Sequence, residues 1–286
     1  MIVGVIGSGA WGTALAIVAA AGGADVVLWS FDGCPAEFDG VTRSDKIRVV
    51  TDMADLATAD VWLAVTPSAF FRDTIARARP FYRGVPVIIC TKGADRETDQ
   101  FMSGVLRDAL PECTEYGVLS GPQFAAEAAS GIPTGSTLAG TPGAIAAGTS
   151  ALCKMYISPS DDIIGTEICG VGKNAVALIC GYLTATAGEN ERALIFTRAW
   201  GEVMSIGRAL GARIETFSDL CGIGDLYLSA TSPTSRNFAA GVAIARGAAP
   251  SGTTEGIFAL SAMTRRAHQA NVPTPVLDEM RRRLGV

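Results

Sequence analysis

The lysines are the first candidates for chemistry in this chain, because they are few and two of them stand in unusual settings. Only four of the 23 basic residues are lysines. Lys173 lies in an apolar stretch with helical spacing, 163–184, which places hydrophobic residues on nearly every face around it. Its side chain should be buried, and burial lowers the pKa of a lysine toward the range in which it can donate and accept a proton. The alternative is a lysine whose stem reaches the surface.

Four further residues could complete a site around such a lysine. Lys92 follows a predicted strand, so its ammonium group should lie at the carboxyl edge of a sheet. Asp225 follows a glycine and could anchor a catalytic ammonium, or it could be a helix N-cap. Arg236 and Asn237 offer a planar fork and an amide, which suit a phosphate, although such a pair can also be a plain surface feature. The single histidine, His268, lies in a polar helical stretch and is expected to be solvated.

A glycine-rich turn near the N-terminus predicts the cofactor. An apolar run over 2–6 is followed by Gly7-Ser8-Gly9-Ala10-Trp11-Gly12 and then by an apolar helical stretch. Glycines at this spacing allow a strand to turn tightly into a helix, let a pyrophosphate approach the backbone and let helix and strand pack closely. The helix N-terminus supplies N–H groups to the anion. These six residues are therefore predicted to bind a dinucleotide, although glycine turns also occur for steric reasons alone.

The residues after the second predicted strand bear on the choice of cofactor. Asp32 lies at the expected distance from the glycine turn, where a carboxylate binds a ribose 2′-hydroxyl. This favours NAD, with NADP possible, and Phe31 is a flat neighbour for the adenosine. Two alternatives stay open, because Asp32 could belong to a turn and Arg43 could reach in from the loop. Pro67 and Phe71, after another strand, are also predicted to contact the cofactor, unless this segment is simply the start of a helix.

These residues need a sheet and a helical domain to position them. Strands are predicted at 25–29, 61–65, 85–90, 116–119 and 136–139, with helices between them and a last helix over 143–155. This alternation predicts an α/β fold with a doubly wound parallel sheet, the Rossmann fold. Near Pro159 the pattern changes to long helical stretches. We therefore predict a dinucleotide-binding domain over 1–158 and an all-α domain with the substrate and catalytic residues over 159–286.

The composition argues against several kinds of partner. The chain has 286 residues, of which 49% are hydrophobic, and a net charge of −5. An acidic chain without a lysine-rich run argues against nucleic acid and anionic membranes as partners. Stable membrane insertion is not expected either, because glycine, proline or charged residues interrupt every apolar run before it is long enough to span a membrane. The seven cysteines form no CxxC pair, which suits reduced thiols in the cytoplasm and no cysteine-bound metal. A homodimer is the commonest default.

Six short blocks occur in order along almost the whole chain. They are residues 7–16, Thr91-Lys92-Gly93, residues 120–127, Gly172-Lys173-Asn174, Gly224-Asp225-Leu226 with Ser235-Arg236-Asn237, and Glu255-Gly256. Together they resemble the bacterial NAD(P)-dependent glycerol-3-phosphate dehydrogenase family, and six blocks in register are specific. The resemblance implies a Rossmann domain followed by a helical domain like that of 6-phosphogluconate dehydrogenase. It also implies interconversion of dihydroxyacetone phosphate and sn-glycerol 3-phosphate, a phospholipid precursor.

The resemblance further implies roles for individual residues. Lys173 would be the general acid/base, with Lys92 and Asp225 in the active site. The substrate would be a small phosphorylated ketone, and the residues implied to bind it are Asn174, Ser229, Arg236 and Asn237, with Ser229 where the family usually has threonine. Further contacts with the dinucleotide are implied for Lys92, Ala125, Arg236 and Glu255. No metal is required.

The chain departs from this family in several places. The segment 38–48 does not match the usual one, the C-terminus is shorter, and the usual Asp-Gly downstream of Lys173 is replaced within 182–190. These differences bear on cofactor choice, oligomer contacts and the substrate pocket. Two alternatives follow: a diverged paralogue that reduces another phosphorylated or carboxylated ketone, and a non-catalytic protein that binds or senses NAD.

Overall fold

The computed structural model describes residues 1–250 and 255–286. It divides the chain into two compact units, Met1–Ile163 and Ile164–Val286. The boundary predicted after residue 158 falls inside strand β8 (Tyr156–Ser160), which belongs to the sheet of the first unit. Polar residues and a proline made this strand hard to recognise in the sequence. Strand β8 lies at the edge of the sheet, where a proline is tolerated.

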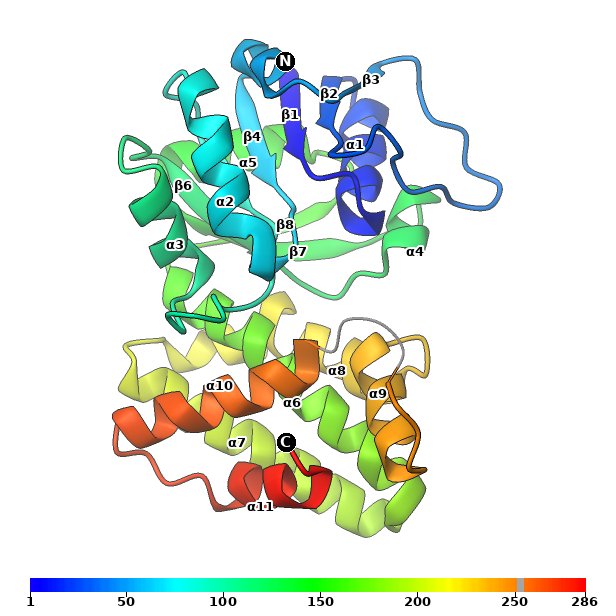
Figure 1. Cartoon of the computed structure of the whole chain (residues 1–286), viewed down its shortest axis with the longest axis vertical. Helices are drawn as coiled ribbons and strands as arrows, with labels where there is room; N and C mark the ends of the chain where they lie inside the picture. Colours follow the sequence, from blue (N-terminus) through cyan, green and yellow to red (C-terminus); the bar gives the residue numbers. More distant parts are fainter. Residues whose placement is uncertain (251–254) are drawn as a thin grey trace. The chain divides into compact units, whose positions relative to one another are not determined.

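The first unit is built on one eight-stranded sheet with the order β3-β2-β1-β4-β5-β6-β7-β8 (Figure 1). The remaining strands are β1 (Ile2–Ile6), β2 (Asp25–Trp29), β3 (Ile47–Val50), β4 (Val61–Ala64), β5 (Val87–Ile89), β6 (Tyr116–Ser120) and β7 (Gly135–Gly140). Strand β1 lies between β2 and β4, with Val3 opposite Val26 on one side and Val61 on the other. The strand order changes direction between β1 and β4. In open α/β sheets, ligands bind at the carboxyl ends of the strands beside such a change.

Helices cover both faces of this sheet, as a doubly wound fold requires. They are α1 (Ala10–Ala21), α2 (Ser68–Ala78), α3 (Met102–Ala109), α4 (Ala125–Ala129) and α5 (Pro142–Ala151). One hydrophobic core joins the sheet to α1, α4 and α5, and a second joins it to α2 and α3. The predicted α/β Rossmann architecture is confirmed. One detail of the prediction was wrong, because β6 and β7 pair antiparallel: the five-residue α4 between them is too short for the usual helical crossover.

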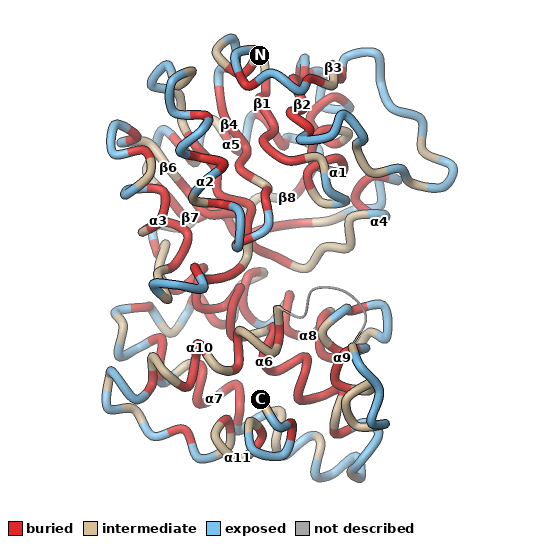
Figure 2. Tube along the Cα trace, in the orientation of Figure 1, coloured by how far each residue is buried: buried red, intermediate tan, exposed pale blue. Residues whose placement is uncertain are grey.

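The described residues of the second unit form helices joined by turns and loops, with no strand among them. Its helices are α6 (Ile163–Thr186), α7 (Glu189–Ala209), α8 (Asp225–Thr231), α9 (Arg236–Ala245), α10 (Glu255–Gln269) and α11 (Pro275–Leu284). Helix α6 is its buried centre, drawn mostly red in Figure 2. By length and composition α6 could cross a membrane, but 83% of its most apolar window is buried inside the protein. This burial is what a core helix requires, and it also encloses the lysine that α6 carries.

Candidate active site

The glycine turn leaves a helix N-terminus open to an anion. Gly7 follows β1 with φ of +115°, a backbone conformation that favours glycine. A side chain on Gly12 would collide with the carbonyl oxygen of Gly7, so helix and turn are in direct contact. Gly9 is the N-cap of α1 and no side chain caps this helix. A methyl group on Gly9 would meet no protein atom within 4 Å. The backbone here therefore fits the pyrophosphate of a dinucleotide.

Asp32 is held toward the glycine turn by a chain of hydrogen bonds. The Ser8 hydroxyl donates to Ser30 Oγ over 2.7 Å, and the Ser30 hydroxyl donates to Asp32 Oδ1 over 3.0 Å. The backbone N–H of Cys34 also donates to Asp32 Oδ1, over 2.9 Å. This N–H, followed by the Ser30 hydroxyl, holds the pKa of Asp32 below its usual value. A charged carboxylate therefore stands at the end of β2, where a ribose hydroxyl would bind.

Two predicted aromatic contacts differ in their exposure. Phe31 is 76% exposed, with the guanidinium carbon of Arg77 5.9 Å from its ring centre, and is available to a ligand. Phe71 is 0% exposed and lies in the core between the sheet and α2, so its predicted contact with a cofactor was wrong. Its neighbour Phe70 is 63% exposed instead. The helical spacing of Phe71 with the buried Ile75 was the signal that could have distinguished the two phenylalanines. Pro67, the N-cap of α2, is exposed.

Lys92 lies at the carboxyl edge of the sheet, as predicted. It follows β5, and its Nζ donates to the carbonyl oxygen of Gly121, just after β6, over 2.9 Å. The hydroxyl of the preceding Thr91 donates to the carbonyl oxygen of Thr66, beyond β4, over 2.6 Å. These bonds tie three adjacent strand ends together around the lysine. Ala125 opens α4 and is half-buried.

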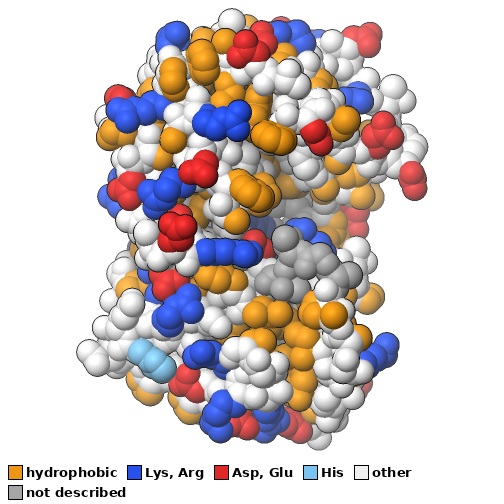
Figure 3. Space-filling view, viewed as in Figure 1, with side chains coloured by type: hydrophobic (Ala, Val, Ile, Leu, Met, Phe, Trp, Pro, Cys, Tyr) orange, Lys and Arg blue, Asp and Glu red, His pale blue; other side chains and the backbone are white. Residues whose placement is uncertain are grey.

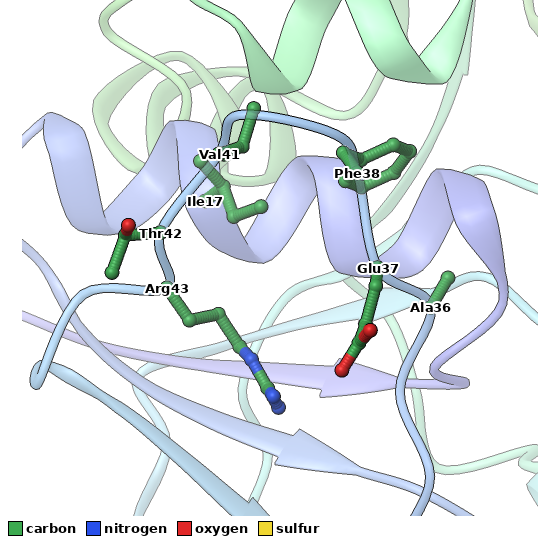
Figure 4. A pocket seen from close by; sticks show the side chains of 7 residues that line it. All are labelled: Ile17, Ala36, Glu37, Phe38, Val41, Thr42 and Arg43. Carbon is green, nitrogen blue, oxygen red and sulfur yellow. The ribbon is translucent and has the colours of Figure 1, made fainter.

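A separate hollow of about 330 Å³ lies where the loop between β2 and β3 crosses α1. It is lined by Ile17, Ala36, Glu37, Phe38, Val41, Thr42 and Arg43. In Figure 4 the side chains of Glu37 and Arg43 extend to the same side of the loop. None of the predicted cofactor residues lines this hollow.

In the helical unit, Lys173 is bound by a carboxylate and a hydroxyl. Its Nζ lies 3.1 Å from Asp225 Oδ1 and donates to Ser229 Oγ over 2.9 Å. The Ser229 hydroxyl in turn donates to Asp225 Oδ1 over 3.2 Å. The lysine side chain is 11% exposed and the aspartate side chain 2%, so the predicted burial of Lys173 is confirmed. This closed triangle orients one ammonium group that is largely shielded from water.

Helix α8 supplies these two partners of the lysine from one face. Asp225 and Ser229 are four residues apart, a spacing that places their side chains on the same side of a helix. Gly224, not Asp225, is the N-cap, so the alternative of Asp225 as a helix cap was wrong. A π-helical turn over Leu220–Gly224 leads directly into Asp225. Such turns are common at functional sites, and this one delivers the carboxylate toward α6.

Two asparagines join three helices beside this triangle. Asn237 Nδ2 donates to Asn174 Oδ1 over 2.8 Å, and Asn237 Oδ1 accepts from the backbone N–H of Gly256 over 2.8 Å. Arg236 is exposed at the first position of α9. Glu255 is half-buried at the first position of α10. The amide of Asn237 therefore links α6, α9 and the start of α10, next to an accessible guanidinium group.

The surface carries no basic field on the face shown in Figure 3, where Lys and Arg side chains are interspersed with Asp and Glu. His268 is exposed as predicted, with 63% of its side chain accessible. It has a partner that the sequence did not suggest, because its Nε2 lies 3.6 Å from Asp278 Oδ1. Neither His268 nor Asp278 touches the lysine triangle in the described contacts.

An α/β unit with a helix N-terminus open to a pyrophosphate, joined in one chain to a helical unit with a buried ammonium group, is the organisation of a nicotinamide-dependent dehydrogenase. Family models of the NAD-dependent glycerol-3-phosphate dehydrogenase N-terminus and C-terminus match residues 2–146 and 162–284. The chain therefore belongs to the NAD-dependent glycerol-3-phosphate dehydrogenase family, and it is an NAD(P)-dependent oxidoreductase.

Individual relatives agree with this assignment. The chain is 39% identical to a glycerol-3-phosphate dehydrogenase of Methylobacterium radiotolerans, over 96% of this chain and 89% of the relative. It is 41% identical to one of Rhodospirillum rubrum, over 86% of this chain and 75% of the relative. The crystal structure of a glycerol-3-phosphate dehydrogenase from Coxiella burnetii superposes with a TM-score of 0.90 and 27% identity, covering 99% of this chain and 94% of that one. The similarity extends through both units.

Proposed function

We propose that this protein reduces dihydroxyacetone phosphate to sn-glycerol 3-phosphate with NADH or NADPH, and catalyses the reverse oxidation. The triangle of Lys173, Asp225 and Ser229 carries the proposal. Ketone reduction needs a proton donor for the oxygen, and this ammonium group is held in place and shielded from water. Binding of a dinucleotide alone would not require a buried ammonium group in the helical unit.

The residues of the chain divide the work of the reaction. When bound, the reduced nicotinamide supplies a hydride to the carbonyl carbon of the ketone. Lys173 gives a proton to the oxygen of that carbonyl group, and Asp225 holds the ammonium in position. Lys92 provides a second positive charge that stabilises the developing alkoxide. Ser229 accepts from Lys173 and donates to Asp225, so its hydroxyl fixes the angle between them.

The substrate phosphate is assigned to the start of α9. Arg236 is exposed there and offers a planar guanidinium fork. Asn237 Nδ2 has two hydrogens and uses one for Asn174, which leaves the other for a phosphate oxygen. Binding energy at the phosphate, away from the reacting carbon, would orient the ketone.

The dinucleotide is assigned to the α/β unit. Residues 7–12 would hold its pyrophosphate, Asp32 the adenosine ribose, and Phe31 with the exposed Phe70 the adenine side. Pro67, Lys92, Ala125, Arg236 and Glu255 are proposed as further contacts. The charged state of Asp32 favours NAD over NADP, because a 2′-phosphate would meet a carboxylate. A homodimer in the cytoplasm, without stable membrane insertion, completes the proposal.

Replacement of Arg236 tests the assignment of the substrate. Arg236→Ala should lower kcat/KM for dihydroxyacetone phosphate by about a hundredfold, since a charge-assisted pair at an anion is lost. With NADH saturating, so that the proposed contact of Arg236 with the dinucleotide does not limit the rate, the rate with unphosphorylated dihydroxyacetone should stay within about twofold, because that ketone has no phosphate to bind. Arg246→Ala is the matched control, because Arg246 is exposed at the other end of the same helix. An equal loss with both ketones would contradict the assignment of the phosphate.

A further inference from the structure

The segment that carries Lys92 is folded around Asp95, a residue to which the proposed reaction gives no role. Between β5 and α3 the chain forms a closed turn, in which Ala94 pairs with Phe101 in an antiparallel bridge. The backbone N–H of Asp95 donates to the carbonyl oxygen of Gln100 over 2.8 Å, and the N–H of Asp99 donates to that of Asp95 over 3.0 Å. Asp95 is the position where these bonds meet, three residues after the lysine.

The side chain of Asp95 holds the turn from inside. Its Oδ1 accepts from the backbone N–H groups of Glu97 and Thr98, over 3.1 and 2.9 Å, and from the Thr98 hydroxyl over 2.9 Å. Asp95 is only 8% exposed. Burial raises the pKa of Asp95, but the bonds from Thr98 and Glu97 and the charge of Arg72 outweigh it, and the net shift is downward. The residue is therefore a charged acceptor at the centre of the turn.

Arg72 connects this turn to helix α2. Its Nε lies 3.4 Å from Asp95 Oδ2, and its Nη2 donates to Gln100 Oε1 over 3.0 Å. The same guanidinium group also reaches Asp108 on α3, with Nη1 3.6 Å from Oδ2. The Asp108 side chain is 51% exposed, whereas that of Asp95 is 11% exposed. The two carboxylates share one arginine, but only Asp95 also binds the backbone of the turn.

We propose that Asp95 is a positioning residue that sets the place of the Lys92 ammonium group through the turn it organises. This inference rests on the proposed function, in which Lys92 stabilises the alkoxide. Lys92 leaves β5 immediately before the turn and reaches the carbonyl oxygen of Gly121. Without the Asp95 carboxylate, the backbone N–H groups of the turn lose their acceptor and the start of the turn is no longer fixed. A shift of about 1 Å in a catalytic group can cost a hundredfold in rate.

The first test compares two carboxylates on one arginine. Asp95→Ala should lower kcat/KM for dihydroxyacetone phosphate by about tenfold to a hundredfold, with the Kd for NADH within about twofold of that of the unaltered protein. Asp108→Ala, the matched control, should leave both within about twofold, since Asp108 is a partly exposed partner. Asp95→Asn keeps an acceptor oxygen and should recover part of the rate. Equal small effects from Asp95→Ala and Asp108→Ala would overturn the proposal.

A double-mutant cycle shows whether Asp95 acts through Lys92. In a Lys92→Ala background, Asp95→Ala should lower kcat/KM by less than about twofold, because the group it positions is already gone. The full loss in both backgrounds would show a general structural role and overturn the inference. If Asp95→Ala does not fold, Thr98→Val removes one bond to Oδ1 and should give a smaller loss in the same pattern.

A measurement without turnover separates this inference from the proposed function. Limited acetylation, read by mass spectrometry, reports the accessibility of each lysine. Asp95→Ala should raise the labelling rate of Lys92 several-fold. Lys46 is the matched control, because its Nζ also donates to a carbonyl oxygen, that of Gly23, over 2.9 Å. Its labelling rate should stay unchanged, because it lies outside the turn that Asp95 organises. Unchanged Lys92 labelling overturns the inference. Absence of turnover by the unaltered protein, with the labelling change present, overturns the proposed function alone.

Discussion

The proposed sites of the two units are built from different parts of the chain. In the α/β unit the site is mainly backbone: Gly9 exposes a helix N-terminus without a side-chain cap, and Gly12 packs against Gly7. In the helical unit the site is made of side chains that bind one another, with Lys173 held by Asp225 and Ser229. The first arrangement keeps room free for a ligand, and the second fixes a reactive group before any ligand arrives.

Each of the two sites is therefore sensitive to a different kind of substitution. An added methyl group harms a backbone site by occupying space, and at Gly9 no neighbouring part of the protein comes within 4 Å of that space. A deleted side chain can harm a buried cluster twice, because it removes the side chain itself and takes one ion-pair contact from a buried partner. Substitution of Gly9 in the glycine turn should therefore change affinity, whereas substitution of Lys173 in the triangle should change turnover and stability together.

The largest expected effect is in the helical unit. Lys173→Ala should lower kcat by about a hundredfold to ten-thousandfold, because the proton donor is lost. It should also lower the free energy of unfolding by about 3 kcal/mol, since Asp225 is left buried without its cation. Absorbance assays of NADH oxidation and urea unfolding measure the two effects. Lys154→Ala, at an exposed lysine, is the control. Near-normal turnover in Lys173→Ala would contradict the proton-transfer role.

Two glycine substitutions test the backbone site. Gly9→Ala should raise the Kd for NADH by about tenfold or more, because an overpacked contact costs about 1–3 kcal/mol, while thermal stability stays unchanged. Gly12→Ala should lower the free energy of unfolding by about 1–3 kcal/mol as well, since its methyl group meets the carbonyl oxygen of Gly7. Fluorescence titration and thermal unfolding separate the two outcomes. An unaltered NADH affinity in Gly9→Ala would place the pyrophosphate elsewhere.

Substitution of Asp32 tests a charged side chain beside the backbone site. Asp32→Asn should raise the ratio of kcat/KM for NADPH to that for NADH by about tenfold, because the repulsion of a 2′-phosphate is removed. The lowered pKa of Asp32 keeps the carboxylate charged through the neutral range, so the preference of the unaltered protein should not change with pH there. Steady-state kinetics with both cofactors measure the ratio. A ratio that does not move would indicate that the loop, with Arg43, decides the preference.

The smallest expected effect concerns Glu202, a carboxylate whose pKa is raised, whereas that of Asp32 is lowered. Glu202 is 8% exposed on α7 and accepts the N–H groups of Val276 and Leu277 at the start of α11, over 2.8 and 2.9 Å. Burial raises the pKa of Glu202 above 4.5. The stability linked to its proton is therefore complete below about pH 4.5 and is lost as the pH rises through the raised value.

Glu202→Gln should remove that pH dependence from urea unfolding. At neutral pH it should cost about 1 kcal/mol, because an amide offers one acceptor oxygen to two N–H groups. Turnover should stay unchanged, since this carboxylate caps a helix and touches no proposed ligand. An unfolding profile that keeps the same slope just above pH 4.5 would show that another group titrates there.

The parts of the protein that could be predicted are those whose signals are local in sequence. The glycine turn and the helical stretch around Lys173 each lie within a few neighbouring residues, and the fold follows from the alternation of strands and helices. Edge strands β3 and β8 were missed because they are short and partly polar. The choice of Phe71 over Phe70 failed because the phase of α2 decides which ring is exposed.

Contacts between residues far apart in the chain could not be predicted from the sequence. Ser229 lies 56 positions from Lys173, and only the family resemblance pointed to this serine. Asp95 gave no signal at all, because its role depends on Arg72 from another helix and on the folded shape of its own turn. Hydrogen-bonded clusters of this kind are defined by tertiary structure alone.

The most direct test of the account is the initial rate of NADH and NADPH oxidation by the purified protein with dihydroxyacetone phosphate, beside unphosphorylated dihydroxyacetone and a panel of 2-keto and 3-keto acids. The account predicts fast oxidation that depends on the phosphate and on Lys173. Turnover of another ketone alone would assign the chain to a different substrate. NADH binding without oxidation across the panel would contradict the catalytic role of the buried lysine.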